Sequence, residues 1–340
     1  MKQQEIPSPS LAGVWATGYP SIFATHLLWG MLPLYFILTS PANAFEVVAA
    51  RILFSIVFCS LILCFTHRGW KNLFKAFSNR ILMGALVIAS LLIGCNWLLY
   101  VIATTSGHTL DASLGYFMNP LVSVVLGVLF LGERLRVAQW LAVSLAAAGV
   151  TVMSVLYGHV PWIGLGLATS FGLYGLVKNK VGGKVNPLHS FAIELALLSP
   201  LALTLMIFFY FSERLTLFSF GAGHFWILAA SGIVTAVPLL LFADAASKLP
   251  LSVIGMVQYI NPTLQFLIAF FLFGERLAPI EWGGYIAIWV ACALFTTDAV
   301  RTSQLNRKAI REAEVLRLAT TASLGIVTAE DLSDQDGERP

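Results

Sequence analysis

The stretch that decides the fold is YFMNPLVSVVLGVLFLGERL, residues 116–135, which returns 142 positions later as QYINPTLQFLIAFFLFGERL, residues 258–277. Both copies contain an Asn-Pro pair, end in Gly-Glu-Arg-Leu, and are followed five residues later by a tryptophan. Both lie within strongly apolar sequence. The chain therefore contains an internal duplication, and we expect two related halves.

The composition is that of a protein surrounded by lipid. Hydrophobic residues make up 58% of the 340 positions and charged residues only 11%, which is about half the charged share of a soluble domain. Such a chain cannot cover itself with polar side chains in water. The apolar runs are also longer and more continuous than the strands of a membrane barrel require. The sequence predicts an all-α integral membrane protein.

Ten apolar runs are long enough, at about 17–25 residues, to cross a bilayer as helices. Each half of the chain holds five of them, and because five is odd, the halves enter the membrane with opposite polarity. We therefore expect ten transmembrane helices in two inverted five-helix repeats. The predicted spans are residues 19–39, 44–65, 81–103, 110–131, 137–156, 160–178, 187–211, 224–246, 251–273 and 280–298.

Four segments follow from these spans. Residues 1–18 form an N-terminal segment without the pattern of a removable signal peptide, 19–157 the first repeat, 158–299 the second repeat, and 300–340 a tail. The tail is predicted to begin as a basic helix on the membrane surface. Its acidic end has too little apolar surface to fold alone and is predicted to be disordered.

The short loops set the orientation, because cytoplasmic loops carry an excess of Lys and Arg. With the N-terminus inside, nearly all basic loop residues fall inside, so both termini are predicted to be cytoplasmic. The inner set is Lys2, Arg68, Lys71, Lys75, Arg80, Arg134, Arg136, Lys178, Lys180, Lys184 and Lys248, and the outer set is Arg214 and Arg276.

Polar residues form a stripe in two equivalent spans, 110–131 and 251–273. In each span they recur at i, i+3 and i+7, which puts them on one face of a helix. An unpartnered amide is costly at this depth, so each residue either joins helices through hydrogen bonds or binds a solute. The two stripes together predict a shared polar cavity. They are Tyr116, Asn119 and Ser123, and their equivalents Gln258, Asn261 and Gln265.

A buried cation and a further amide fall near the same depth. Arg51 lies seven residues into span 44–65, about 10 Å below the outer surface at the rise of a helix, and Asn96 lies at a similar depth. Arg51 has two interpretations: an ion pair with Glu46 or Asp111, or contact with an anionic group of a substrate. The candidate solute-binding residues are Arg51, Asn96, Tyr100, Tyr116, Asn119, Gln258, Asn261 and Trp29.

Two carboxylates are candidates for coupling transport to protons. Glu194 lies as far from the inner end of span 187–211 as Arg51 lies from the outer end of its own span, and no nearby cation is evident. Burial favours the neutral form of a carboxyl group. Glu46 is the second candidate. By contrast, Asp244 has Lys248 one turn away, and a surface ion pair explains it.

Other features predict neither a cofactor nor a metal. The four cysteines lie inside spans without metal-binding spacing, and the formal charge of +3 comes mainly from the inner loops. His26, Trp29 and Pro33 share one face of the first span, where a histidine among aromatic residues is more often explained by packing. The expected partners are the lipid bilayer, a small-molecule solute and protons as a coupling ion, without nucleic acid. The oligomeric state is not encoded in any pattern that we can identify.

Taken together, these runs resemble the RarD-type branch of the EamA-like transporters, within the drug/metabolite transporter superfamily. The resemblance covers about residues 19–300. The most similar stretches begin at Asn96, Asp111, Gly172, Gly232 and Gln258. The resemblance implies a central cavity between two inverted repeats. It also implies movement of small metabolites or drugs, often outward, across the bacterial inner (plasma) membrane.

Two other classes of function stay open at this point. A non-transporting membrane scaffold or sensor shares the composition of a carrier. A membrane-embedded enzyme would need a nucleophile with its base, a metal cluster or a phosphate-binding loop, and the corresponding motifs HExxH, GxSxG and the P-loop do not occur. The sequence therefore favours a secondary carrier that is not an enzyme.

Overall fold

The computed structural model describes residues 11–66, 69–105, 109–156, 160–272, 282–283, 286–295, 297–298, 301 and 312. Within these ranges the regular structure is helical and no strand occurs, so the predicted all-α architecture is confirmed. The helices are α1 (Leu11–Gly30), α2 (Leu32–Leu38), α3 (Ala44–Phe65), α4 (Gly69–Phe77), α5 (Arg80–Thr105), α6 (Thr109–Leu131), α7 (Val137–Leu156), α8 (Trp162–Val181), α9 (Pro187–Phe211), α10 (Gly221–Ala246), α11 (Leu251–Val257) and α12 (Ile260–Phe271).

Six stretches of the described residues are long and apolar enough to cross a membrane, and a bent pair of helices raises this number to seven. The bent pair is Gly18–Gly30 with Leu32–Leu38, which meet at 41°. Two shorter apolar helices, Gly115–Leu131 and Ile286–Phe295, accompany them. The six stretches are Ala44–Phe65, Arg80–Ala103, Val137–Val155, Pro187–Phe211, Gly221–Ala246 and Leu251–Ile268.

Two of the predicted spans are interrupted helices. The first breaks at Met31, directly before Leu32 and Pro33, where proline is well tolerated because the first turn of a helix lacks acceptors for its N–H groups. The other breaks at Gln258 and Tyr259, between α11 and α12 and just before Asn261. Breaks of this kind free backbone groups inside a membrane protein and are tolerated where protein or a cavity surrounds them.

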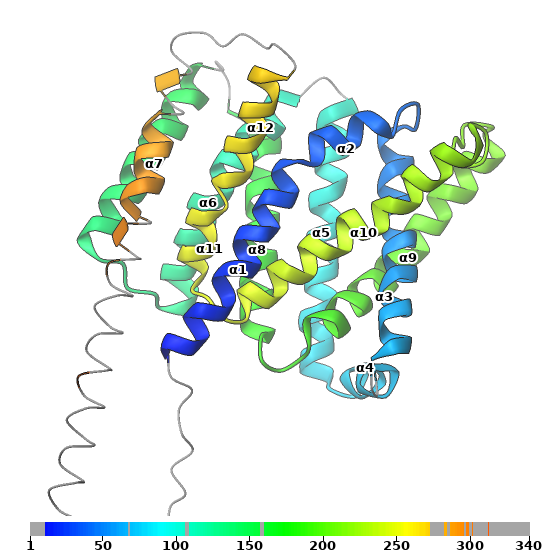
Figure 1. Ribbon diagram of the computed structural model, residues 1–340, viewed down its shortest axis with the longest axis horizontal. Coiled ribbons are helices and arrows are strands. Elements are labelled where there is room, and N and C mark those ends of the chain that lie inside the picture. Colours follow the sequence, from blue (N-terminus) through cyan, green and yellow to red (C-terminus); the bar gives the residue numbers. More distant parts are fainter. Residues whose placement is uncertain are drawn as a thin grey trace, which may run out of the picture.

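The structure differs from the predicted spans at two places. Helix α1 begins at Leu11 rather than at residue 19. Helix α4 was not predicted, because its nine residues are amphipathic and too short for a span. It packs against α3, α5 and α9 and buries Leu73. It lies across one end of the bundle (Figure 1).

The helices form two groups around a common interior. Helices α5, α6 and α8 pack together, and α1 packs against α10, α11 and α12. Helix α3 packs against both α9 and α10. In Figure 1 the bundle has one end near α2 and the top of α12 and an opposite end near α4, which we call the α2 end and the α4 end.

Close backbone approach explains two glycines between the groups. A Cβ atom on Gly255 in α11 would lie 2.7 Å from the backbone oxygen of Pro120 in α6. A Cβ atom on Gly232 in α10 would clash with the backbone of Phe54 in α3, which packs against the second group. Small residues at such contacts let helices in lipid approach closely enough to associate.

Several predicted features lie outside the described residues. These are the second Gly-Glu-Arg-Leu motif at 274–277, parts of the span 280–298, and the tail 300–340 apart from Arg301 and Glu312.

Candidate functional site

A cavity lies between the two helix groups, nearer the α2 end than the α4 end. Its water-accessible volume is about 80 Å³, room for only a few water molecules, so a solute of metabolite size requires it to widen. Stripe residues from both halves of the chain meet there, together with Arg51. The cavity is lined by all eight candidate solute-binding residues: Trp29, Arg51, Asn96, Tyr100, Tyr116, Asn119, Gln258 and Asn261.

The cationic side of the cavity is built around Arg51. Its Nε donates a hydrogen bond to Thr235 Oγ1 on α10 at 2.8 Å. Its guanidinium carbon lies 5.6 Å from the ring centre of Phe36 and 5.3 Å from that of Trp97. No carboxylate among the described side chains lies within ion-pair distance of it. The guanidinium is held by a hydroxyl and two rings, which leaves its charge available to an anion.

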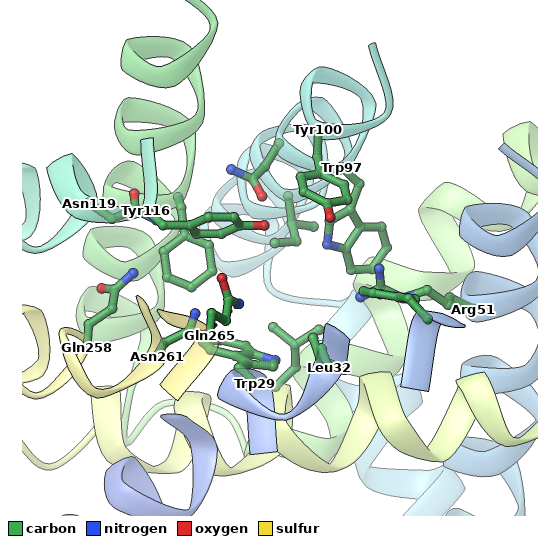
Figure 2. Close-up of a pocket in the computed structure, with 15 residues that line it drawn as sticks. Trp29, Leu32, Arg51, Trp97, Tyr100, Tyr116, Asn119, Gln258, Asn261 and Gln265 are labelled. Carbon is green, nitrogen blue, oxygen red and sulfur yellow. Dashed lines mark hydrogen bonds between the residues drawn. The ribbon is translucent and has the colours of Figure 1, made fainter. Parts of the chain in front are cut away.

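The amide side lies across the cavity from Arg51. Figure 2 shows Asn119 and Gln258 on one side, Arg51 on the other, and Tyr116 and Gln265 between them. Asn119 Oδ1 and Gln258 Oε1 are buried and have no hydrogen-bond partner among the described residues. A buried acceptor without a partner is costly, so this side of the cavity suits a ligand that donates hydrogen bonds.

The other amides have partners in the protein. Gln265 Nε2 donates to Asn261 Oδ1 at 2.9 Å. Asn96 Nδ2 donates to the backbone oxygen of Leu167 at 2.9 Å and to Ser170 Oγ at 3.0 Å. Asn96 therefore ties α5 to α8 as well as lining the cavity, so both interpretations of a polar stripe apply to it. Ser123, the remaining stripe residue of the first half, packs near Gly255 instead of lining the cavity.

Aromatic rings close the cavity toward the α4 end. The ring centres of Trp29 and Phe171 are 5.5 Å apart, and Phe242 lies 5.2 Å from Phe171 and 5.7 Å from Trp29. Tyr174 stacks on Phe242 at 6.1 Å. These four rings form a floor of packed aromatic side chains, and such pairs prefer the edge-on and offset arrangements seen here.

Glu194 lies beyond this floor and has a cation, which corrects the expectation from the sequence. Its Oε1 is 2.6 Å from Lys178 Nζ, and both side chains are 1% exposed. Tyr174 donates to Glu194 Oε2 at 3.1 Å, and Lys178 also donates to Ser190 Oγ at 2.6 Å. The assignment of Lys178 to an inner loop was wrong, because α8 continues to Val181 and Lys178 points into the protein.

Glu46 does not pair with Arg51, so the expectation of an ion pair between these two residues was wrong. The Glu46 carboxylate accepts hydrogen bonds from the backbone N–H groups of Thr216 and Leu217, both at 2.8 Å, and from the Thr216 hydroxyl at 3.0 Å. It thereby holds the turn before α10 against the start of α3. The side chain of Asp111, the other suggested partner, lies outside the described residues.

Polar contacts join the two helix groups at the α4 end. Glu133, in the first Gly-Glu-Arg-Leu motif, accepts hydrogen bonds from the backbone N–H groups of Leu251 at 2.6 Å and Ser252 at 2.9 Å. These N–H groups begin α11 and have no acceptor within the helix. Asn179 on α8 donates to the backbone oxygens of Ala246 at 2.8 Å and Leu249 at 3.2 Å. We call the contacts of Glu133 and Asn179 the α4-end seal.

Sequence reasoning found Glu133 as part of a motif but not its role. Its partners lie 118 and 119 positions away and are backbone groups, which no side-chain pattern identifies. The repeat itself was the available signal, because it pairs α6, which ends two residues before Glu133, with α11 and α12, which begin at Leu251.

The remaining candidates are simpler. Asp244 Oδ1 is 2.6 Å from Lys248 Nζ, with both side chains about one-third exposed, so the predicted surface pair is confirmed. His26 is buried and its ring packs 5.5 Å from Trp29, and neither ring nitrogen is hydrogen-bonded to a residue that the structure describes. In the part of the chain that the structure describes, no cluster of three His, Cys, Asp or Glu side chains could hold a metal ion.

Apolar helices of membrane-spanning length around a polar interior cavity define a helical integral membrane protein. The sequence profile of the EamA-like transporter family matches residues 16–155 and again residues 160–297. The chain belongs to this family, in its RarD-type branch of the drug/metabolite transporters.

Named relatives agree with this assignment, and a solved structure shares the fold. Protein RarD of Streptomyces exfoliatus is 40% identical over 307 residues, covering 90% of this chain and 96% of the relative. The uncharacterized transporter YojE of Bacillus subtilis is 39% identical, covering 83% of this chain and 94% of the relative. A crystal structure of a protein only 16% identical superposes with a TM-score of 0.65, covering 83% of this chain and 98% of that one, which is a likeness of fold.

Proposed function

We propose that the protein is a secondary carrier that moves a small metabolite or drug-like solute outward across the bacterial inner membrane by alternating access. In this proposal ten transmembrane helices form two inverted five-helix repeats, 19–157 and 158–299, with both termini in the cytoplasm. The central cavity binds the solute.

The observation that carries the proposal is the pairing of residues around the cavity. Its lining includes four pairs whose members are separated by the same 142 positions. Equivalent positions of two repeats come together only near the axis that relates them, which is where inverted-repeat carriers bind their solutes. The pairs are Trp29 with Phe171, Trp97 with Leu239, Tyr116 with Gln258, and Asn119 with Asn261.

The helix contacts support the same symmetry. By the 142-residue offset, α3 corresponds to α9, α5 to α10, and α6 to α11 with α12. The same offset relates α8 to the end of α1 and to α2. Helix α3 contacts α10, and the equivalent helices α9 and α5 are also in contact. Helix α1 contacts α10, and the equivalent helices α8 and α5 are also in contact. One hydrogen-bonded contact also occurs twice, because Thr25 is equivalent to Leu167 and Asn96 is equivalent to Pro238. Thr25 donates to Pro238 O at 3.3 Å, and Asn96 donates to Leu167 O at 2.9 Å.

The difference between the two ends supports alternating access. The cavity and the guanidinium of Arg51 that lines it lie toward the α2 end, whereas the aromatic floor and the α4-end seal close the opposite end. In the proposed cycle the α5–α6–α8 group and the α1–α10–α11–α12 group rock about the cavity. The α4-end seal breaks when the cavity opens to the cytoplasm.

The two sides of the cavity suggest a solute with two kinds of group. Arg51 would bind a carboxylate or phosphate, since guanidinium groups hold such anions through paired hydrogen bonds. The acceptor oxygens of Asn119 and Gln258 would take N–H or O–H donors of the same molecule. Tyr100 and Tyr116, whose ring centres are 6.2 Å apart, would cover its apolar surface.

The direct test begins with the solute. Metabolites inside and outside deletion and overexpression cells are compared, and the compounds that change are loaded into proteoliposomes containing the purified protein. The proposal predicts protein-dependent efflux with unchanged chemical structure. A scaffold or sensor would give no flux of any such compound, and a membrane enzyme would release a converted product.

The topology has its own test. Reporter fusions at Arg68, Lys180 and the C-terminus should report the cytoplasm, and fusions at Ser40 and Ser212 should report the outside. Basic residues of the described loops and helix ends are more numerous at the α4 end than at the α2 end, which supports this orientation. An outside signal from the C-terminus would contradict the ten-helix inverted arrangement.

Proton coupling is the remaining part of the proposal, and it assigns the proton to Glu194. The carboxylate needs either Lys178 or a proton to lie where it does, because an uncompensated buried charge is strongly unfavourable. Uptake into proteoliposomes should respond to an imposed pH gradient, and Glu194→Gln should abolish the response while leaving solute exchange. Indifference of the unmodified protein to the gradient would remove the proton from the cycle. Glu46, bonded to a turn, stays a second candidate for the same measurement.

A further inference from the structure

A second buried cation lies toward the α4 end, beyond the aromatic floor of the cavity. Lys178 is 1% exposed and is neutralised by Glu194 at 2.6 Å, with Ser190 and Tyr174 completing the cluster. The cluster joins α8 to α9. Ser90 on α5 also donates to the backbone oxygen of Glu194 at 3.2 Å.

The repeat relates this cluster to the cationic side of the cavity. At an offset of 142 positions, Lys178 corresponds to Phe36 and Ile193 corresponds to Arg51. Phe36 and Arg51 both line the cavity, and the Arg51 guanidinium lies against the Phe36 ring. Each half therefore places one cation at the same junction, between its first and second helices, although the cation comes from α3 in one half and from α8 in the other.

The repeat symmetry also predicts which residues would line a cavity that is open at the α4 end. If the inverted repeats exchange conformations, the residues equivalent to the present lining form the lining of a cavity that is open at the α4 end. Tyr174, the equivalent of the lining residue Leu32, would then face that cavity together with Lys178 and Ile193. All three are buried in the present structure, so they are not accessible until the α4 end opens.

An ion pair is a poor choice if the only task is to close this end. Two charges removed from water recover their desolvation cost only partly, and an apolar pair of similar volume is often as stable or more stable. Apolar residues occupy the equivalent positions Phe36 and Ile52 in the first half. The charges at Lys178 and Glu194 therefore need a role that apolar side chains cannot fill.

We propose that Lys178 is a second anion site of the carrier, which binds the carboxylate or phosphate of the solute when the cavity is open at the α4 end. Glu194 is the internal anion that occupies Lys178 while that end is closed. Arg51 and Lys178 then bind the same group of the solute in the two halves of the cycle. This inference rests on the proposed function and extends it to a solute that carries an anionic group.

Charge-selective labelling tests the proposal without knowledge of the solute. In a protein whose four native cysteines are replaced, Ile193→Cys reports on the position equivalent to Arg51 and removes no hydrogen bond. Glu133→Gln weakens the α4-end seal. Inside-out vesicles are treated with sulfonatoethyl methanethiosulfonate, which is anionic, or with the cationic trimethylammonioethyl reagent, and the two rate constants are compared.

The expected result is preferential reaction with the anionic reagent when Lys178 is free. Glu194→Gln should raise the ratio of the anionic to the cationic rate constant. Relative to Glu194→Gln alone, the double variant Lys178→Met with Glu194→Gln should lower this ratio by about tenfold. This is the effect of one charge about 5 Å away on two oppositely charged reagents. The double variant leaves no charge unpaired, so its folding does not depend on the ion pair. Lys178→Arg should keep the preference.

The possible outcomes distinguish a failure of the second anion site from a failure of the proposed carrier function. Asn179→Cys, at the seal itself, reports whether the α4 end opens at all. If Asn179→Cys reacts but Ile193→Cys does not, the second anion site is wrong and the carrier proposal stands. The same conclusion follows if Ile193→Cys reacts with the same ratio of rate constants with and without Lys178. If neither cysteine reacts in the seal variant, the α4 end does not open and both proposals are wrong.

Discussion

The two ends of the bundle hold their buried cations in opposite conditions. At the α2 end, Arg51 is supported by a hydroxyl and two rings and lines a cavity. At the α4 end, Lys178 is neutralised by Glu194 and enclosed. The halves come from one duplicated sequence, so the difference reflects the conformation captured as well as the side chains. One end of the molecule therefore places its cation beside a cavity, whereas the other end encloses its cation in an ion pair.

The largest effect should follow from removing the cation that lines the cavity. Arg51→Gln should reduce transport of an anionic solute by about 10- to 100-fold, since hydrogen bonds to charged groups contribute about 1.5–3 kcal/mol. Arg51→Lys keeps the charge but not the planar group that lies against Phe36 and Trp97. Its transport rate should lie between those of the unmodified protein and Arg51→Gln. Initial rates in proteoliposomes, normalised to folded protein, give the measurement. Equal rates for the unmodified protein and Arg51→Gln would remove the anion from the account.

The amides should give the next largest effect, and they form a matched pair. Asn119→Leu and Asn261→Leu should both reduce transport strongly. They should differ in stability, because Asn119 Oδ1 has no partner whereas Asn261 Oδ1 accepts from Gln265. Replacing Asn119 should leave the thermal midpoint unchanged or higher, and replacing Asn261 should lower stability by about 1 kcal/mol. Transport that falls only in proportion to folded protein would mean that the amides merely join helices.

A smaller effect is expected from weakening the closed end alone. Glu133→Gln loses the charge and one of the two acceptor oxygens that cap the start of α11, a change of about 1 kcal/mol. Opening at the α4 end should therefore increase about fivefold. The rate of modification of Ile193→Cys, which leaves the Asn179 contacts intact, measures it from the cytoplasmic side. A thermal midpoint that collapses without any gain in accessibility would assign Glu133 to folding only.

The smallest effect is expected at the surface pair. Lys248 and Asp244 are as close as Lys178 and Glu194, 2.6 Å in both cases, but are about one-third exposed. Lys248→Ala should change the free energy of unfolding by less than about 1 kcal/mol and leave transport unchanged. Lys178→Met should be strongly destabilising, because it strands a buried carboxylate. Similar losses from both variants would show that burial does not distinguish the two pairs.

Sequence reasoning succeeded where a physical cost made a residue conspicuous. Amides and an arginine at membrane depth are unfavourable without a reason, and the repeat indicated that Asn119 and Asn261 should meet, as they do around the cavity. Their role in binding a solute stays a prediction. The apolar runs were equally informative about the long helices, since length and hydropathy alone identify most of them.

The rest depended on details that sequence patterns do not specify. Lys178 was assigned to a loop because a predicted span ended at that residue, and α8 is three residues longer. That small error hid the partner of Glu194. The carboxylates of Glu46 and Glu133 bind backbone N–H groups far away in the chain, and any residue can supply such a donor. Short α4 lacked the length of a span and was missed for that reason.

The central claim is that the two ends open in alternation, and a pair of distances tests it most directly. Spin labels at Lys180 and Lys248 report the α4 end, and labels at Leu38 and Ile102 report the α2 end, in lipid nanodiscs. When the α4-end seal is removed by Glu133→Gln with Asn179→Ala, the account predicts that the first distance lengthens while the second shortens. A longer first distance with an unchanged second distance would contradict alternating access, because the seal would then hold one end without any link to the other.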